Sequence, residues 1–259
     1  MPPKDAIPKG KAAARKALQI DDASAEAHAS LAYAHFEYDW DWAACEKEFK
    51  RAIQLSPNYA TAHQWYSDYL STSRRGSEAV AECKRAQELD PLSPTINFNL
   101  AWRYFFMRQY DRAIRGLQET ISLFPDFAQT YLLLARAYLT KGMYQEAIGA
   151  FQKNRSLLGA SPVEVAALGR AYTKGGMRGY YLWELRRLRE ESKHRYVRAA
   201  EFAYRFARLG EKNQALSYLE KAYEDRDWLL TQLPIDPVWD PLRSDPRYQD
   251  LLRRMNFPR

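Results

Sequence analysis

The stretch AQTYLLLARAYLTKGMYQEAIGAFQKNRSLLGAS, residues 128–161, predicts two amphipathic helices joined by a tight turn. Residues three or four positions apart share one face of a helix. Leu134, Ala135 and Tyr138 share such a face on the first helix, and Ala147 and Phe151 share one on the second. Small side chains let two helix backbones approach closely, and large ones fill the groove around them. The stretch therefore predicts a packed helix pair.

The same pattern recurs along the chain at a step of about 34 residues. The large apolar position of the first helix is occupied by Leu31, Tyr66, Leu100, Leu134, Leu168 and Phe202. Its small neighbour is occupied by Ala32, Ser67, Ala101, Ala135, Gly169 and Ala203. The small position of the second helix is occupied by Ala79, Ala113, Ala147, Tyr181 and Ala215. Prolines, which cannot continue a helix, close three of the repeats at positions 57, 91 and 125.

This order of large and small positions resembles the tetratricopeptide repeat (TPR) family over nearly all of the chain. The resemblance implies an all-α fold, a right-handed α-solenoid of helix-turn-helix repeats with a C-terminal capping helix. We expect a TPR array over residues 1–229 and a capping segment over 230–259. Within the array, we expect a half-repeat at 9–23 and full repeats at 25–59, 60–93, 94–127, 128–161, 162–195 and 196–229.

Residues 240–255 predict a turn followed by a last helix. Ser244 or Asp245 is the expected N-cap, with Pro246 in the first turn. The apolar stripe that we expect to close repeat seven consists of Tyr248, Leu251, Leu252 and Met255. This ending resembles the C-terminal TPR region of bacterial multidomain signalling and transcription regulators. Because the half-repeat lacks its first helix, we also expect the chain to be a fragment of a longer regulator.

Composition is ordinary, with 46% hydrophobic and 27% charged residues among 259. No apolar run reaches the length of about 18 residues that a membrane span needs, and the start lacks a signal peptide. A cytoplasmic location follows as a default. Cys45 and Cys83 fall in or beside helix-packing positions, which predicts buried, reduced thiols.

Two repeats depart from the pattern. Repeat two carries one extra residue in or near 38–42, where Trp40 and Trp42 alternate with aspartates. This turn could be a recognition loop. We favour the alternative, in which the two tryptophans cover the turn and an aspartate caps the second helix. In repeat six, Tyr181 takes the alanine position, which predicts helices pushed apart or shifted in register. The glycine-rich stretch 174–179 before it predicts an interhelical turn rather than a phosphate loop.

No catalytic motif survives the repeat assignment, so we expect no enzymatic activity, no cofactor and no metal. His28 and His63 occupy equivalent positions of successive repeats, which raises the alternative of a metal site between them. No cysteine or carboxylate pattern completes such a site. Packed histidines are the favoured interpretation.

The TPR resemblance implies that the first helices line a concave groove that binds a ligand. The groove residues that we expect are Tyr33, Phe36, Gln64, Asp68, Phe98, Trp102, Phe105, Arg136, Arg170 and Tyr204. Phe98, Trp102 and Phe105 are spaced to share one helix face, and aromatic and arginine side chains dominate binding hot spots. The alternative is that these rings pack between repeats. For Trp102 we favour the groove.

The leading functional hypothesis is a non-catalytic scaffold that binds a peptide or protein segment in this groove. The alternative is a nucleic-acid-associated regulatory module that uses the basic C-terminal half. The formal net charge is +7, and much of it gathers between Arg178 and Arg208, but interspersed glutamates favour a solvated helix face there. Nucleic acid and membrane are therefore not the expected partners, and the oligomeric state stays open.

Overall fold

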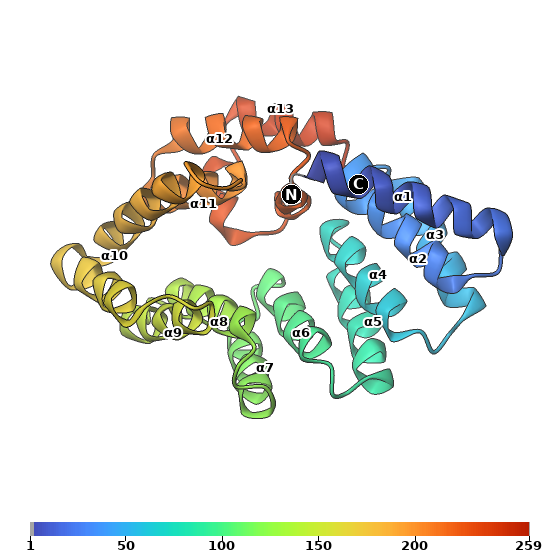
Figure 1. Ribbon diagram of the computed structural model, residues 1–259, viewed down its shortest axis with the longest axis horizontal. Helices are drawn as coiled ribbons and strands as arrows, with labels where there is room; N and C mark the ends of the chain where they lie inside the picture. The colour runs from blue at the N-terminus through green and yellow to red at the C-terminus, as the bar shows by residue number, and fades with distance from the viewer. Residues whose placement is uncertain (1–2, 259) are drawn as a thin grey trace. The chain divides into compact units, whose positions relative to one another are not determined.

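The chain is built of helices throughout the residues that the computed structural model describes, Pro3–Pro258 (Figure 1). No strand occurs in this range, so the all-α prediction is confirmed. The first elements are α1 (Pro3–Ile20), α2 (Ala25–Ala34), η1 (His35–Asp39), α3 (Trp42–Leu55), α4 (Ala60–Thr72), α5 (Gly76–Leu89), α6 (Pro94–Phe106) and α7 (Tyr110–Leu123). They are followed by α8 (Ala128–Thr140), α9 (Tyr144–Leu157), α10 (Pro162–Ser192), α11 (Ala199–Leu209), α12 (Lys212–Glu224), η2 (Trp228–Gln232), η3 (Pro237–Leu242) and α13 (Pro246–Met255).

These helices form two compact units. The middle unit comprises Asp90–Arg187, and the terminal unit combines Met1–Leu89 with Leu188–Arg259. Within the terminal unit, the first repeats and the last helices pack together. The division into a TPR array over 1–229 and a capping segment over 230–259 stays a prediction. The helix α1 lies over the predicted half-repeat at 9–23, but it begins earlier, at Pro3, and continues through Pro8.

Consecutive helices pair through small residues. Ala32, Ala135, Ala147, Ala203 and Ala215, which occupy the small positions of the repeat, are completely buried. A larger side chain at such a point would separate the two helices or force strained rotamers. The periodic pattern in the sequence thus corresponds to the contacts that hold each helix pair together.

A second recurring contact lies at the start of the first helices. There a polar side chain reaches the backbone carbonyl six residues earlier. The four contacts are His28 Nε2 with Asp22 O (3.0 Å), His63 Nε2 with Pro57 O (3.0 Å), Asn97 Nδ2 with Pro91 O (2.9 Å) and Tyr131 Oη with Pro125 O (2.9 Å). Each bond ties the start of a helix to the turn that precedes it.

The two histidines also contact glutamates of the following helices, at 2.5 Å for His28 with Glu48 and 2.6 Å for His63 with Glu82. At His63, a carbonyl and an ionised carboxylate both accept hydrogen bonds, so this geometry suits an imidazolium that donates from both nitrogens. Both nitrogens of each ring are engaged, which argues against the metal-site alternative. Burial alone lowers the pKa of His63, but the bonds to Glu82 and Pro57 outweigh it and raise that pKa above its ordinary value.

We predict that His63→Asn removes a pH-dependent part of the stability. Asparagine, which the next repeat uses at this position, keeps the carbonyl bond but loses the ion pair. The pKa of His63 is raised in the folded state. The stabilisation that comes from its ion pair with Glu82 is therefore fully present below the ordinary pKa of 6.5, and it is lost as pH rises through the raised pKa. Urea unfolding at pH 5 should show a loss of about 1.5–3 kcal/mol, and the loss should shrink at pH 9. His194→Asn, at an exposed histidine, is the control; an equal loss at both pH values would contradict the assignment.

The extra residue of repeat two is accommodated by η1, a five-residue π-helix, followed by Trp40 in the left-handed conformation (φ 57°). Asp41 then caps α3 by accepting a hydrogen bond from the backbone N–H of Ala44 at 3.1 Å. Trp40 and Trp42 are both buried. The favoured interpretation of this turn, hydrophobic cover with an aspartate cap, is confirmed.

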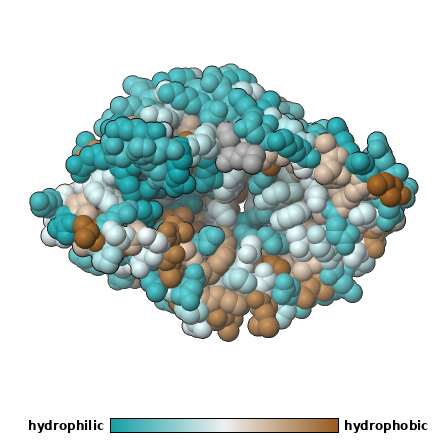
Figure 2. All heavy atoms as spheres, viewed as in Figure 1, coloured by the Kyte–Doolittle hydropathy of each residue, from teal (hydrophilic) through white to brown (hydrophobic). Residues whose placement is uncertain are grey.

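The last helix begins where the sequence predicts. Asp245 is the N-cap, since its carboxylate accepts a hydrogen bond from the backbone N–H of Arg247 at 2.9 Å, and Pro246 follows in the first turn. Tyr248, Leu251 and Met255 are buried. The surface over α12 and α13 is largely hydrophilic in the view of Figure 2, so α13 buries one face and exposes the other.

Repeat six is one long element, α10, with a break at Gly175 and Gly176. Gly176 has φ 57° and ψ −151°, a conformation essentially confined to glycine. The predicted interhelical turn at 174–179 is therefore present. Tyr181 is buried in edge contact with the Tyr180 ring, and nearby Gly179 lies so close to the first half that an added Cβ would sit 2.3 Å from the carbonyl oxygen of Ala171.

We predict that Gly179→Ala destabilises the middle unit by about 1–3 kcal/mol, because the methyl group would overlap backbone rather than a movable side chain. Gly149→Ala is the matched control: it also lies within a helix, but nothing lies within 4 Å of its added Cβ. That substitution should stabilise by about 0.4–1 kcal/mol. Urea denaturation of both variants measures the difference, and equal stability would show that the close approach at Gly179 does not constrain repeat six.

Candidate ligand-binding site

The ten expected groove residues are divided between the two units. The terminal unit holds Tyr33, Phe36, Gln64, Asp68 and Tyr204. The middle unit holds Phe98, Trp102, Phe105, Arg136 and Arg170.

In the middle unit, two of the expected groove rings belong to the hydrophobic core. Phe105 is completely buried and Phe98 is 8% exposed, and both pack with Leu117, Leu133 and Leu134. The expectation that these two rings form an accessible groove surface is therefore wrong. They occupy the side of α6 that is covered by α7 and α8, so the alternative of packing between repeats holds for them.

Trp102 lies at the edge of this core and keeps part of its surface exposed. Its ring centroid is 5.1 Å from that of Phe98 and 5.5 Å from that of Phe106. The indole N–H has no hydrogen-bond partner among the described residues. That nitrogen is itself buried, so the part of Trp102 that a ligand could reach is its ring surface and not this donor.

Guanidinium groups lie over the same aromatic cluster. The Arg103 Cζ atom is 5.9 Å from the centroids of both Trp102 and Phe106. The Arg136 Cζ atom is 5.1 Å from the centroid of Phe105. We refer to Trp102, Arg103, Phe106 and Arg136 as the aromatic–arginine patch.

Arg103 and Phe106 are not among the residues that the repeat spacing assigns to the groove. Phe106 follows Trp102 by four residues on the same helix, so helical spacing alone could have identified it. Arg103 carries no such signal, because an arginine in a first helix predicts solvent exposure, whereas this one is only 2% exposed. Arg170, in contrast, is exposed as expected on the first half of α10.

In the terminal unit, the expected groove residues are largely covered. Phe36 and Gln64 are buried, so the expectation of an accessible surface is wrong for these two. Tyr33 stacks on Trp65 with 4.5 Å between ring centroids. Tyr204 faces the edge of Trp239 from η3, at 6.4 Å. The chain itself thus occupies much of this inner surface.

A group of acidic side chains lies at the same place. Burial, together with the charges of Asp68 and Asp227, raises the pKa of Glu37 to about 7, although a hydrogen bond with Tyr33 opposes the shift. Asp227 is completely buried. One of its oxygens accepts a bond from Leu229 N at 3.0 Å, and the other has no hydrogen-bond partner among the described residues. Glu37 carries no sequence signal, because its burial arises from contacts that are distant in sequence.

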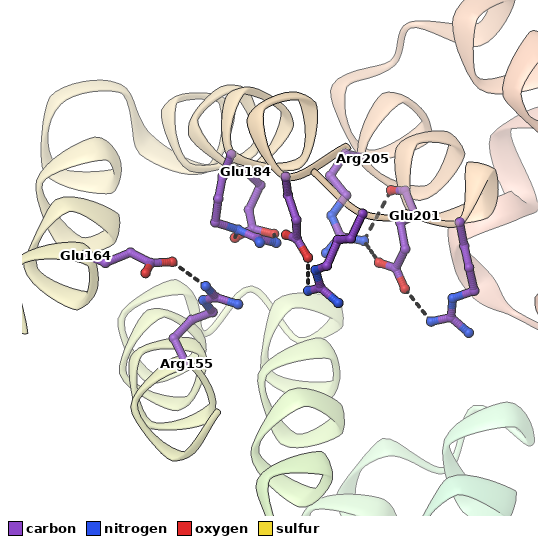
Figure 3. Close-up of polar contacts among 9 residues, drawn as sticks. Arg155, Glu164, Glu184, Glu201 and Arg205 are labelled. Carbon is purple, nitrogen blue, oxygen red and sulfur yellow. Dashed lines mark hydrogen bonds and ion pairs between the residues drawn. The ribbon is translucent and has the colours of Figure 1, made fainter. Parts of the chain in front are cut away.

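Four arginines of the basic stretch, Arg187, Arg195, Arg198 and Arg205, are paired with glutamates, and Figure 3 shows such pairs around Glu184 and Glu201. Glu201 lies between two guanidinium groups, those of Arg205 and of Arg198, the latter at 2.7 Å. Burial by itself would raise the pKa of Glu201, but these two arginines lower it to about 2. Arg187 is similarly paired with Glu184 at 3.3 Å. This pairing reduces the charge available to a phosphate backbone.

Cys45 and Cys83 are completely buried and neither forms a disulfide. Burial raises the pKa of the Cys45 thiol well above its ordinary value. Within residues 3–258, no three His, Cys, Asp or Glu side chains are grouped so that they could hold a metal ion. In the same range, no helix combines the length and apolar character needed to cross a membrane.

Comparison with known proteins matches part of the chain to a known repeat. Residues 98–156 match the tetratricopeptide repeat family model. A curated protein of Mycosarcoma maydis, small glutamine-rich tetratricopeptide repeat-containing protein 2, is 35% identical over 75 residues, which is 29% of this chain. The chain spans only about a fifth (21%) of the length of that relative.

Two solved structures share the fold. PilW, described as a widely conserved type IV pilus biogenesis factor, is 17% identical, with a TM-score of 0.56 over 96% of this chain and 92% of its own. TTC0263, a thermophilic TPR protein of Thermus thermophilus, is also 17% identical, with a TM-score of 0.53 over 61% of this chain and 85% of its own. At such identities the likeness concerns the fold alone. The fold is an all-α solenoid of TPR helix pairs.

Proposed function

We propose that the chain is a non-catalytic scaffold that binds a peptide or protein segment through the aromatic–arginine patch of the middle unit. The observation that carries the proposal is the partly exposed Trp102 ring, fixed between Phe98 and Phe106. Rigid aromatic rings beside arginine are the side chains that contribute most to binding at protein interfaces.

The chemistry of the patch indicates what the segment should carry. An apolar side chain fits against the Trp102 and Phe106 rings. A neighbouring carboxylate suits the guanidinium group of Arg136, because arginine pairs with carboxylates in a defined geometry. Arg136 is half-buried beside Phe105, so a charge bound there would be less screened by solvent than one on an exposed helix face.

The match of residues 98–156 to the TPR family model supports this choice of surface, since all four residues of the patch, three on α6 and one on α8, lie within it. The ion pairs of the basic stretch favour peptide binding over the nucleic-acid alternative. That the scaffold serves in a larger cytoplasmic bacterial regulator is also part of the proposal, and it rests on the resemblance of the C-terminal end to such proteins.

Trp102→Ala should weaken binding of such a segment by at least about 2 kcal/mol, a thirtyfold or greater rise in Kd. The probe is obtained by selecting a phage-displayed random peptide library on the wild-type chain. The most enriched sequence is then synthesised with a fluorophore and measured by fluorescence anisotropy. We expect the enriched peptides to place an apolar residue beside an acidic one.

Arg189→Ala is the control, because Arg189 is exposed and lies outside the patch; it should leave Kd nearly unchanged. The helical circular dichroism of both variants should match that of the wild type. Equal affinity of the selected peptide for the wild type and Trp102→Ala would show that the patch is not the binding surface.

A further inference from the structure

A cavity of about 460 Å³ lies between α1 and η1 in the terminal unit. The helix α1 packs against α2 (Figure 1), and η1 continues directly from the end of α2. Six side chains of α1 and two of η1 line the cavity. Small-molecule sites in proteins usually measure about 300–1,000 Å³, so this cavity has the size of such a site.

The lining of the cavity carries an excess of positive charge. The helix α1 contains five lysine or arginine residues and one acidic residue, Asp5. Three of these cations, Lys11, Arg15 and Lys16, line the cavity. Among the described residues that line it, Asp39 of η1 is the one acid.

That single carboxylate is already paired within the chain. Lys11 forms an ion pair with Asp39, and His35 Nδ1 lies 2.8 Å from the same carboxylate oxygen. Burial and the charge of Lys11 lower the pKa of His35, and the charge of Arg15 acts in the same direction. His35 is therefore neutral at neutral pH, and the negative charge of Asp39 is compensated by Lys11.

The other two cations of the lining have no such partner. The side chains of Arg15 and Lys16 are exposed and form no hydrogen bond or ion pair with any residue that the structure describes, and neither does the Gln19 amide. In the basic stretch at 178–208, by contrast, Arg187 and Arg198 are paired with glutamates. Arg15 and Lys16 also precede the last turn of α1, so the partial negative charge of the helix C-terminus compensates them only weakly.

Helix geometry brings these three unpaired groups together. Gln19 follows Arg15 by four positions and Lys16 by three, so its side chain is a neighbour of both on the helix surface. All three side chains line the cavity. One turn of α1 thus presents a planar guanidinium, an ammonium and an amide, all of which can donate hydrogen bonds.

We propose that this cavity binds a small phosphorylated molecule, whose phosphate group is held by Arg15, Lys16 and Gln19. A phosphate monoester has a charge of about −1.5 to −2 at pH 7 and three strong acceptor oxygens. Two uncompensated cations match that charge, and three donor groups match the three oxygens. Arginine can bind phosphate through two parallel N–H groups, whereas lysine contributes a point charge.

The remainder of the lining indicates what the phosphate is attached to. Pro8 and Ala12 continue the lining towards the N-terminus of α1, and the half-buried Tyr38 contributes from η1. The helix rises about 16 Å from Pro8 to Gln19, which leaves room for a ring beside the phosphate. An aromatic ring suits this part, because it can pack on the Tyr38 ring. The site lies in the terminal unit and does not depend on peptide binding in the middle unit.

Phenyl phosphate is the probe for this site, because it joins a phosphate monoester to one aromatic ring. Its binding to the full chain is measured at pH 8 and low ionic strength by a saturation-transfer-difference NMR titration, since salt screens exposed charges. We expect a Kd of about 1 mM, as suits so small a ligand. Phenol, which has the ring without the phosphate, should bind at least about tenfold more weakly.

Arg15→Gln and Lys16→Gln should each raise the Kd of phenyl phosphate about tenfold or more, because each removes a charged donor. Lys9→Gln is the matched control: it removes the same charge from the same helix, but Lys9 is exposed and does not line the cavity. It should leave Kd nearly unchanged. Trp102→Ala should bind the probe like the wild type, which separates this site from the aromatic–arginine patch.

Two results would overturn the proposal. One is the absence of phenyl phosphate binding up to about ten times the expected Kd. The other is an equal loss of affinity in Lys9→Gln and in the two cavity variants, which would reflect general attraction to the basic helix α1 and not a site in the cavity.

Discussion

Each helix pair depends on a small side chain at the point where two helix backbones come closest. Alanines at these positions have no solvent exposure in the first, middle and last repeats alike. The constraint is steric and local: a residue larger than alanine must be compensated nearby. Repeat six shows such a compensation, because Tyr181 replaces the alanine while Gly179 allows the backbone to pass close to Ala171. The remaining large side chains then fill the space on either side of each contact.

Because this constraint is local and recurs every repeat, much of the fold could be predicted from the sequence. The helix pairs, the aspartate cap before α3 and the Asp245 cap of α13 all follow from patterns within a few residues. The packing of the first repeats against the last helices could not be predicted in this way. It depends on single contacts such as Trp42 with Met255, which have no period and join residues far apart in sequence.

The candidate site was predictable only in part, for a related reason. Repeat spacing assigned Phe98, Trp102 and Phe105 to one face of α6. That face is wide enough to include residues inside the hydrophobic core as well as residues at its edge. Phe105 falls inside and Trp102 at the edge. The partners that distinguish Trp102, namely Phe106 and Arg103, are set by how α6 packs on its neighbours. Spacing could indicate Phe106 but not the burial of Arg103.

The two units use aromatic side chains differently. In the terminal unit, the Trp40 ring lies against Tyr223 and the Trp42 ring against Phe257, both from the C-terminal part of the chain. In the middle unit, Trp102 keeps part of its surface exposed. The first two rings are thus covered by the chain itself, whereas the third is not fully covered.

The association of the two chain ends in one unit is the claim that most of this account depends on, and chemical cross-linking tests it most directly. Lys4 Nζ of α1 lies 4.0 Å from a carboxylate oxygen of Asp225, after α12. A carbodiimide joins an amine to a carboxylate only when the two are in contact, so mass spectrometry of the treated chain should find Lys4 linked to Asp225. The Lys141–Asp111 ion pair within the middle unit is the internal standard. A Lys141–Asp111 link without any link between residues 3–89 and residues 188–258 would contradict the account.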